Sequence, residues 1–208
     1  MIWIICLLLI GGDLLGSIPS AVWIGRGFYR TDVREYGSHN AGATNTLRVL
    51  GRRAALPVFV IDAAKGYGAV MLAHLADLQG DGLFFLKIGL TAAAILGHIF
   101  PIFAGFKGGK GVATMAGCML AIAPIPMLMG LATFVIVLAV SHYVSLGSMT
   151  GGVLFPFYIL LIDGFRPYKL LFGVLVAVVL LITHRKNIKR LREGTENKTF
   201  LFIRRPKA

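Results

Sequence analysis

The chain is poor in charged residues and in cysteine. Only 14% of its 208 residues are charged, 57% are hydrophobic, and the mean hydropathy is +0.79. Because so little polar surface cannot cover a soluble globule of this length, the composition predicts an all-α integral membrane protein. Cys6 and Cys118 both lie in apolar runs, which argues against a disulfide framework and a cysteine metal site.

Several patterns that define other classes of protein are also missing. No residues have the spacing of metal ligands, and we expect neither a metal nor another cofactor. The stretch that ends in Gly109 and Lys110 is not a nucleotide-binding Walker A motif, because Ala104 and Gly111 replace its first glycine and its Ser or Thr. We also find no internal repeat. The sequence therefore gives no support to nucleotide hydrolysis or metal-dependent chemistry.

Apolar runs predict about seven membrane spans, some of them short, in a single domain over residues 1–193. The runs cover residues 2–24, 54–76, 83–104, 112–123, 127–143, 148–162 and 170–183. Pro124 and Pro126 favour a turn between two helices over one kinked helix. The first run is interrupted by Asp13 and has no basic residues before it, so we interpret it as a retained helix and not as a signal peptide. Residues 194–208 are expected to form a loosely ordered basic tail.

The basic residues predict the orientation of these spans. The segment after the first span carries six arginines, the next loop has no Lys or Arg, the third has Lys107 and Lys110, and the tail is basic again. With seven spans, these basic segments all fall on one side, which is then cytoplasmic, with the amino terminus outside and the carboxyl terminus inside. Arg166 and Lys169 are exceptions on the outer side. The net charge of +12 suits anionic lipid headgroups and anionic substrates, not nucleic acid.

The first basic segment contains a nine-residue polar loop, GSHNAGATN, from Gly37 to Asn45. Its glycines allow backbone amides to converge on an anion, and its neutral side chains add hydrogen-bond donors. Arg48, one helical turn further on, has the fork geometry that binds phosphate. The candidate anion-binding residues of this segment are Ser38, His39, Asn40, Gly42, Ala43, Thr44, Asn45 and Arg48.

A second glycine-rich stretch, AGFKGGKG, is the other candidate phosphate site. Lys107 and Lys110 are close enough in sequence for both ammonium groups to reach one phosphate, and Gly108 and Gly109 let the backbone approach it. A helix that starts near Val112 would add its positive N-terminal dipole. We expect this stretch, GSHNAGATN, residues 141–148 and residues 184–187 to reach the same membrane face and to share one site.

Isolated polar residues in or near the spans have two interpretations each. Asp62 and Lys65, three residues apart, form either a mutually neutralising structural pair or part of a site. His98 and His142 are as consistent with helix packing as with ligand contact. His184 and Asn187 have helical spacing and would lie on one face. Gly12 and Gly16 are interpreted as helix-packing residues.

Taken in order along the chain, these motifs resemble one known family. SIPS at Ser17–Ser20, GSHNAGATN, DAAKG at Asp62–Gly66, GHIFPIFAGFKGGKG and SHYVSLGS at Ser141–Ser148 look like the bacterial PlsY family of acyl-phosphate-dependent glycerol-3-phosphate acyltransferases. The resemblance covers residues 17–148, with a looser continuation to Asn187. It implies a multi-pass protein of the bacterial inner membrane with its active site on the cytoplasmic face.

The resemblance also implies the reaction and its reactants. A fatty acyl group would pass from acyl phosphate to the 1-hydroxyl of glycerol 3-phosphate, giving lysophosphatidic acid and inorganic phosphate. The expected partners are these substrates, membrane lipids and, as a candidate, the enzyme that forms acyl phosphate.

The roles of the site residues follow as a hypothesis. The GSHNAGATN loop with Arg48 would hold one phosphate, and Lys107 with Lys110 the other. Ser38, Asn45 and backbone amides would stabilise negative charge on the acyl oxygen. Ser145, His184 and Asn187 would orient the glycerol.

The general base is left open by the residues alone. No histidine in a loop is followed by the H-x-x-x-x-D box of soluble-donor acyltransferases, since Thr44, Phe103 and Gly147 occupy the fifth position after His39, His98 and His142. Either His98, His142 or His184 takes the hydroxyl proton, or the oxygens of the acyl phosphate do so, as the resemblance implies. A covalent acyl-serine ranks last, because no serine is adjacent to a base.

Two other classes of protein compete with an enzyme. A small transporter of organic phosphates would use broken helices, glycine-rich loops and intramembrane charges. However, it would need a site near the midplane, whereas the polar segments gather on one face. A lipid-binding scaffold would explain the basic face but not the polar loop.

Overall fold

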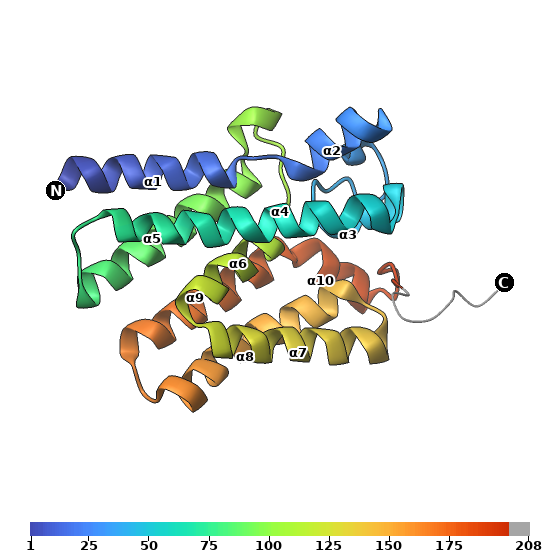
Figure 1. Ribbon diagram of the computed structural model, residues 1–208. Coiled ribbons are helices and arrows are strands. Elements are labelled where there is room, and N and C mark those ends of the chain that lie inside the picture. The colour runs from blue at the N-terminus through green and yellow to red at the C-terminus, as the bar shows by residue number, and fades with distance from the viewer. Residues whose placement is uncertain (200–208) are drawn as a thin grey trace. The chain divides into compact units, whose positions relative to one another are not determined.

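The computed structural model describes residues 1–199 and is helical, with no strand among those residues (Figure 1). The chain divides into two compact units, Met1–Ile122 and Ala123–Ala208. The sequence predicts one domain over residues 1–193. Because the structure has two units, we describe each by itself.

Unit 1 contains six helices and three short 3-10 turns. The helices are α1 (Ile2–Gly16), α2 (Ser20–Tyr29), α3 (Ala43–Leu50), α4 (Arg52–Met71), α5 (Gly80–Ile99) and α6 (Val112–Ile122), and the 3-10 turns are Val33–Glu35, Leu72–Leu75 and Ile102–Ala104. In Figure 1, α1, α4 and α5 lie side by side, and α2 and α3 lie at one end of them.

Small residues let these helices approach closely. A Cβ on Gly16 would overlap the backbone of Ala94, and one on Gly97 would overlap the carbonyl of Asp13, so α1 and α5 meet backbone to backbone. In the same way a Cβ on Gly66 would overlap Thr114 O, which brings α4 onto α6. Such contacts replace the hydrophobic effect where lipid is the solvent. They confirm the packing role predicted for Gly16.

The described part of unit 2, up to residue 199, contains four helices, α7 (Pro124–Ser141), α8 (Val144–Asp163), α9 (Pro167–Thr183) and α10 (Arg185–Arg192). Pro124 is the first residue of α7, so the turn predicted after the short apolar run is confirmed. α9 and α10 meet at a bend of 62°, with His184 between them. His184 is the N-cap of α10 and Asn187 lies in its first turn, and both residues are buried.

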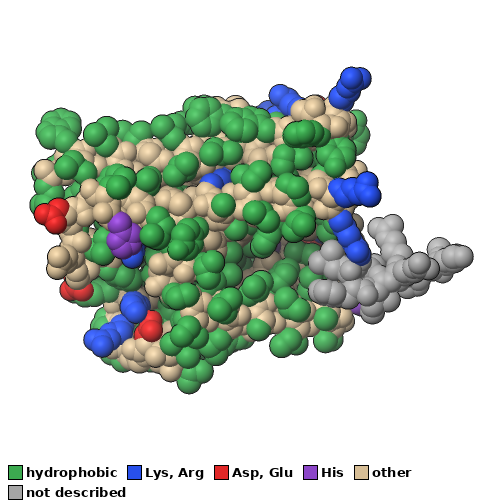
Figure 2. Space-filling model, viewed as in Figure 1, with side chains coloured by type: hydrophobic (Ala, Val, Ile, Leu, Met, Phe, Trp, Pro, Cys, Tyr) green, Lys and Arg blue, Asp and Glu red, His purple; other side chains and the backbone are tan. Residues whose placement is uncertain are grey.

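Among residues 1–199, five helical segments are long and apolar enough to cross a membrane, or six if the bent pair α9 and α10 counts as one span. α1 and α2 form one of them, although the chain breaks between them at Ser17–Pro19. The run predicted as a short span is α6, an apolar helix of only 11 residues. Figure 2 shows hydrophobic side chains over most of the visible helix surface, as expected for contact with lipid, and Trp3, Val140 and Leu161 are among the most exposed.

Residues 194–199 follow α10 and pack within unit 2. Glu196 and Thr199 are buried, and Thr199 N–H donates to His142 O at 2.7 Å. The expectation of a loose tail from residue 194 therefore does not describe residues 194–199, because side-chain contacts fix them within unit 2. The rest of that predicted tail lies outside the described residues.

Candidate active site

The polar loop of unit 1 is shorter than predicted, because its last three residues begin α3. Gly42 is the N-cap of this helix, and Ala43, Thr44 and Asn45 form its first turn. The loop turns tightly through Gly37, with φ +63°, and His39, with φ +57°. A side chain at residue 37 would strike Asn45 Oδ1, at 2.5 Å from the Cβ position, so glycine is needed there for space as well as conformation.

Asn45 holds this loop together. Its side-chain oxygen accepts from Ser38 N–H at 2.8 Å and from the Ser38 hydroxyl at 3.1 Å, and its amide nitrogen donates to Val33 O at 2.7 Å and Tyr36 O at 3.1 Å. Only 1% of the residue is exposed. Both amide hydrogens are thus used within the protein, so in place of the predicted contact with an acyl oxygen we assign Asn45 a positioning role toward Ser38.

The start of α3 is a helix N-terminus with unpaired backbone amides, the kind of group that can bind an anion. No side chain caps the helix, and Gly42 O accepts from Asn45 N–H and Thr46 N–H. The amides of the first turn and the helix dipole therefore favour an anion at Ala43 and Thr44. Arg48 is four residues after Thr44 and lies on the same face of α3. His39 and Asn40 flank this point in the loop, where Asn40 Oδ1 approaches Gly42.

The second glycine-rich loop packs against the end of α5. Gly109 N–H donates to His98 O at 3.2 Å, and Gly108 N–H donates to Ile99 O at 3.1 Å. A Cβ on Gly108 would overlap His98 O, and one on Gly109 would overlap His98 Nε2. The two amides predicted to face a phosphate are therefore used by α5, and the glycines serve to seat the loop.

The two lysines of this loop differ in their surroundings. Lys107 is exposed, and within residues 1–199 its ammonium group makes no hydrogen bond or ion pair. Lys110 is half-buried one residue before Gly111, whose φ is +75°. α6 begins at Val112, as predicted, so its N-terminal turn directly follows the second lysine.

The two loops of unit 1 lie close to each other. Ala41 O would be only 2.9 Å from a Cβ on Gly109. Arg34 also connects them, because its guanidinium donates to Ala104 O at 2.8 Å and to Lys107 O at 3.2 Å, while its own carbonyl accepts a contact from His39 Nδ1 at 3.0 Å.

From the sequence, Arg34 is one of the arginines that predict the orientation of the spans. The structure shows that it also forms an ion pair. Its guanidinium pairs with Asp32 at 2.8 Å, and hydrogen bonds from Arg34 lower the pKa of the Asp32 carboxyl to about 2. Burial opposes this effect, and the charge of Arg26 adds to it. The spacing of Asp32 and Arg34, two residues apart, could have indicated the ion pair. No pattern in the sequence indicated that Arg34 contacts the second loop.

A buried ion pair lies beneath these loops. Asp62 Oδ1 and Lys65 Nζ are 2.8 Å apart, so these residues form an ion pair, as in the first of the two interpretations of their spacing. His98 Nδ1 is 3.6 Å from the same carboxylate oxygen. The sequence pattern shows no histidine with a carboxylate partner. It misses this pair because its members lie far apart in the chain, on different helices.

Unit 2 gathers the remaining candidates around a residue that sequence reasoning did not single out. Glu196 Oε1 accepts from the Ser145 hydroxyl at 2.9 Å and from Asn187 Nδ2 at 2.7 Å, and Arg190 Nε pairs with Oε2 at 2.6 Å. Burial disfavours the carboxylate, but the hydrogen bonds from Arg190, Asn187 and Ser145 outweigh it and lower the pKa of Glu196. The only signal in the sequence is one acidic residue in an otherwise basic tail.

His184 is oriented by the end of α9. Its Nδ1 is 2.8 Å from Leu180 O, and since a carbonyl can only accept, Nδ1 carries the proton in the neutral ring. Nε2 is then the basic nitrogen, as a general base or a hydroxyl acceptor requires. His142 lies elsewhere, at the C-cap of α7 with φ +63°.

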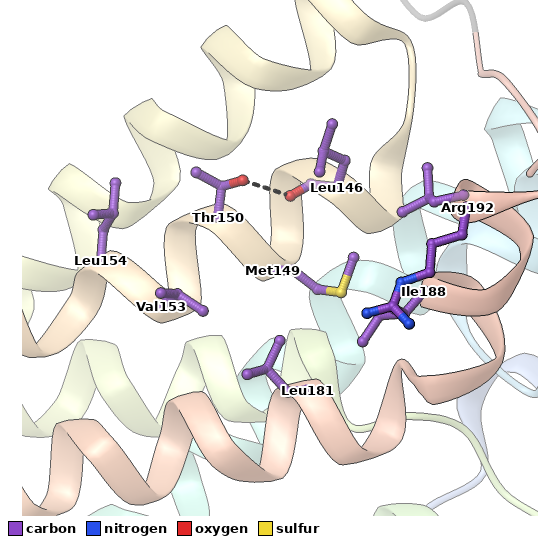
Figure 3. A pocket seen from close by; sticks show the side chains of 9 residues that line it. Leu146, Met149, Thr150, Val153, Leu154, Leu181, Ile188 and Arg192 are labelled. Atoms are coloured by element: carbon purple, nitrogen blue, oxygen red, sulfur yellow. Dashed lines mark hydrogen bonds between the residues drawn. The ribbon is translucent and has the colours of Figure 1, made fainter. Parts of the chain in front are cut away.

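Unit 2 also has an apolar groove of about 450 Å³ between α8, α9 and α10 (Figure 3). Met149, Val153 and Leu181 line its middle, and Figure 3 shows Leu154 at one end and Arg192 at the other. Such a groove suits a hydrocarbon chain with an anionic group at the Arg192 end. Within residues 1–199, no cluster of His, Cys, Asp and Glu side chains could hold a metal ion.

Comparisons with known proteins identify the family of this chain. A family model described as glycerol-3-phosphate acyltransferase matches residues 6–194. Glycerol-3-phosphate acyltransferase of Enterococcus faecalis is 41% identical over 211 residues, with 98% of this chain and 95% of the relative covered. The enzyme of Listeria monocytogenes is 46% identical over 187 residues, with coverage of 89% and 91%.

Solved structures agree as well. The glycerol 3-phosphate form of PlsY, an integral membrane glycerol 3-phosphate acyltransferase, matches with a TM-score of 0.83 and 32% identity over 94% of this chain and 96% of that one. Its lysophosphatidic acid form gives a TM-score of 0.81 and 31% identity, with coverage of 94% and 95%. This chain therefore belongs to the glycerol-3-phosphate acyltransferase family of integral membrane enzymes that includes PlsY.

Proposed function

We propose that the enzyme uses acyl phosphate as its donor and releases lysophosphatidic acid and inorganic phosphate. The oxygen of the 1-hydroxyl attacks the acyl carbonyl carbon, the bond from that carbon to the phosphate oxygen breaks, and phosphate leaves with the hydroxyl proton. The reaction would be the first acylation step of phospholipid synthesis, at the cytoplasmic face of the bacterial inner membrane.

The observation that carries this proposal is the pairing of two cationic loops in unit 1. The first turn of α3 with Arg48 and the exposed Lys107 with Lys110 offer separate sets of phosphate-binding groups, and Arg34 ties the loops together. Two phosphate-bearing substrates need two such sets. Charge neutralisation on the leaving phosphate then supplies most of the catalysis.

Other residues complete the proposed assignment. Ser38, held by Asn45, stabilises charge at the reacting centre. Within unit 2, Ser145, His184 and Asn187 are our candidates for hydrogen bonds to substrate hydroxyl groups. We assign the hydroxyl proton to the oxygens of the acyl phosphate, so that the protein positions the reactants and supplies no base of its own.

Product analysis of the purified protein tests the donor. Long-chain acyl phosphate or acyl-CoA is supplied with glycerol 3-phosphate, and free phosphate and lysophosphatidic acid are measured. We expect product from acyl phosphate alone. Product from acyl-CoA alone would overturn the donor assignment while leaving the family unchanged.

The groove of unit 2 is our candidate for the acyl chain. A larger side chain at its middle, Val153→Phe, should shorten the groove and lower the rate with 18-carbon donors relative to 12-carbon donors by about tenfold, about the cost of burying two methylene groups less well. Val178→Phe, on an exposed part of α9, is the matched control. An unchanged chain-length profile in Val153→Phe would remove the groove from the proposal.

A further inference from the structure

A chain of five buried polar side chains runs through unit 1 and has no part in the assignment above. Its members come from α2, α4, α5 and α6 and are each at most 6% exposed; they are Ser20, Asp62, Lys65, His98 and Thr114. A buried ion pair in a membrane protein is costly, and it is retained where it does something that apolar packing cannot.

Asp62 is the centre of this chain. Its Oδ1 accepts from the Ser20 hydroxyl at 2.8 Å and from Lys65 Nζ at 2.8 Å. Lys65 Nζ donates a second hydrogen bond, of 2.7 Å, to Ile18 O. The carboxylate and the ammonium group are thus both solvated by protein atoms, which fixes their positions.

The chain continues to the imidazole of His98. Nδ1 of this ring is 3.6 Å from Asp62 Oδ1 and 3.0 Å from Thr114 Oγ1. With two partners on one side of the ring, from α4 and α6, the orientation of the imidazole is determined.

The opposite side of the same residue meets the lysine-bearing loop. His98 Nε2 lies against Gly109, where a Cβ would overlap it, and His98 O accepts the Gly109 N–H. Ala41 O, from the first loop, is 2.9 Å from the same Cβ position. Gly109 is therefore enclosed by the His98 ring and the backbone of the other loop.

We propose that Asp62 and Lys65, acting through His98 and Thr114, position residues 107–111 against the first polar loop, residues 37–42. They are positioning residues for the lysines and have no contact with substrate. The inference rests on the proposed phosphate role of Lys107 and Lys110 only for its effect on kinetics. Its effect on the loop itself is independent of that role.

Hydrogen exchange of the full-length protein in detergent tests the loop directly. In His98→Ala and Asp62→Asn, exchange at the amides of Gly108 and Gly109 should become at least about tenfold faster, because the surface that the loop packs against is no longer fixed. Thr91→Val is the control, since Thr91 is a buried residue of α5 outside the polar chain, and its hydroxyl donates within its own helix to Lys87 O at 2.9 Å. Unchanged exchange in both variants would overturn the inference.

Asp62→Asn leaves Lys65 unpaired and can unfold the protein, so a second variant is needed. Asp62→Asn with Lys65→Met removes both charges together, and it should still speed exchange at Gly108 and Gly109. His98→Asn keeps a polar atom near the position of Nδ1 and should restore part of the protection, whereas His98→Gln, with its amide near the position of Nε2, should restore less.

Kinetics separate positioning from proton transfer. For His98→Asn we expect KM for glycerol 3-phosphate or for the acyl donor to rise by about tenfold while kcat stays within about threefold. If kcat instead fell by about a hundredfold or more, with loss of one limb of the pH profile, His98 would be a general base and a purely positioning role would be overturned. Faster exchange with both KM values unchanged would support the positioning of the loop and count against phosphate binding by Lys107 and Lys110.

Discussion

At the scale of single residues, the side chains of Asn45 and Ser38 are hydrogen-bonded to each other, but we expect substitution of Asn45 to affect stability and substitution of Ser38 to affect catalysis. Asn45→Ala removes all four hydrogen bonds of a buried amide, two from Ser38 and two to the carbonyls of Val33 and Tyr36. We expect it to lower the free energy of unfolding by about 2 to 4 kcal/mol. Ser38→Ala should keep the melting temperature and lower kcat by about ten- to a hundredfold. A normal melting temperature with lost kcat in Asn45→Ala would show that this amide acts on the substrate.

Asp32 makes a prediction about pH at the same scale. Its pKa in the folded protein is about 2, below the ordinary value of 3.8. A carboxyl with a lowered pKa stabilises the fold fully above the unfolded value and loses this contribution as the pH falls through the folded value. The melting temperature should therefore fall between about pH 4 and about pH 2, and Asp32→Asn should be less stable at neutral pH with a shallower fall. Asp77→Asn is the control, because Asp77 is exposed and makes no ion pair within residues 1–199.

At the scale of helices, the contact between α4 and α6 depends on two glycines. A Cβ on Gly66 would overlap Thr114 O, and a Cβ on Gly117 would overlap Ala63 O. Gly66→Ala or Gly117→Ala should lower the free energy of unfolding by about 1 to 3 kcal/mol, because the helices must separate. Gly68→Ala, on the same helix with no other atom within 4 Å of its Cβ position, should stabilise by about 0.5 to 1 kcal/mol. Equal effects at residues 66 and 68 would contradict the close contact.

At the scale of the whole molecule, the membrane topology depends on α6. Its 11 residues span about 16 Å, roughly half of the hydrocarbon core, so it completes a crossing only together with the loops at its ends. If α6 completes a crossing, the polar loop after the first span and the tail are on the same side of the membrane. If α6 does not cross, they are on opposite sides.

Cysteine labelling in intact cells decides between these cases. In a background with Cys6 and Cys118 replaced by serine, single cysteines at Gln79 and Arg166 should react with an impermeant reagent. Cysteines at Arg30 and Glu193 should react only after the cells are opened. Labelling of the Glu193 cysteine from outside, with Arg30 protected, would reverse the predicted side of the tail.

Features set by residues close together in the chain were predicted from the sequence, whereas contacts between distant residues were not. The helix start at Val112 and the turn at Pro124 were predicted, and an ion pair of Asp62 with Lys65 was one of two interpretations, because prolines, glycines and helical spacing act locally. Ser145 and Glu196 are 51 positions apart, and Arg34 and Lys107 are 73 apart. Only the packing of helices brings such partners together, and no local pattern reports it.

The same limit explains the reassigned residues of the two loops. Gly108, Gly109 and Asn45 were predicted to meet a ligand because glycine and amide groups suit an anion. In the structure, neighbouring backbone groups use their donors. Sequence indicates which groups can donate hydrogen bonds, whereas the fold determines which of them are still available to a ligand.

The break at Ser17–Pro19 in the first span gives Lys65 a backbone hydrogen-bond acceptor in place of water. In an unbroken helix the Ile18 carbonyl would point along the axis to its own helix, but here it accepts from the Lys65 ammonium group. The break in the helix thus leaves a backbone carbonyl that stabilises a charge on another helix, in a part of the molecule that solvent does not reach. A change that made this span a continuous helix would remove this hydrogen bond from the ammonium group. The irregular backbone of one helix therefore helps a neighbouring helix to keep a buried charge.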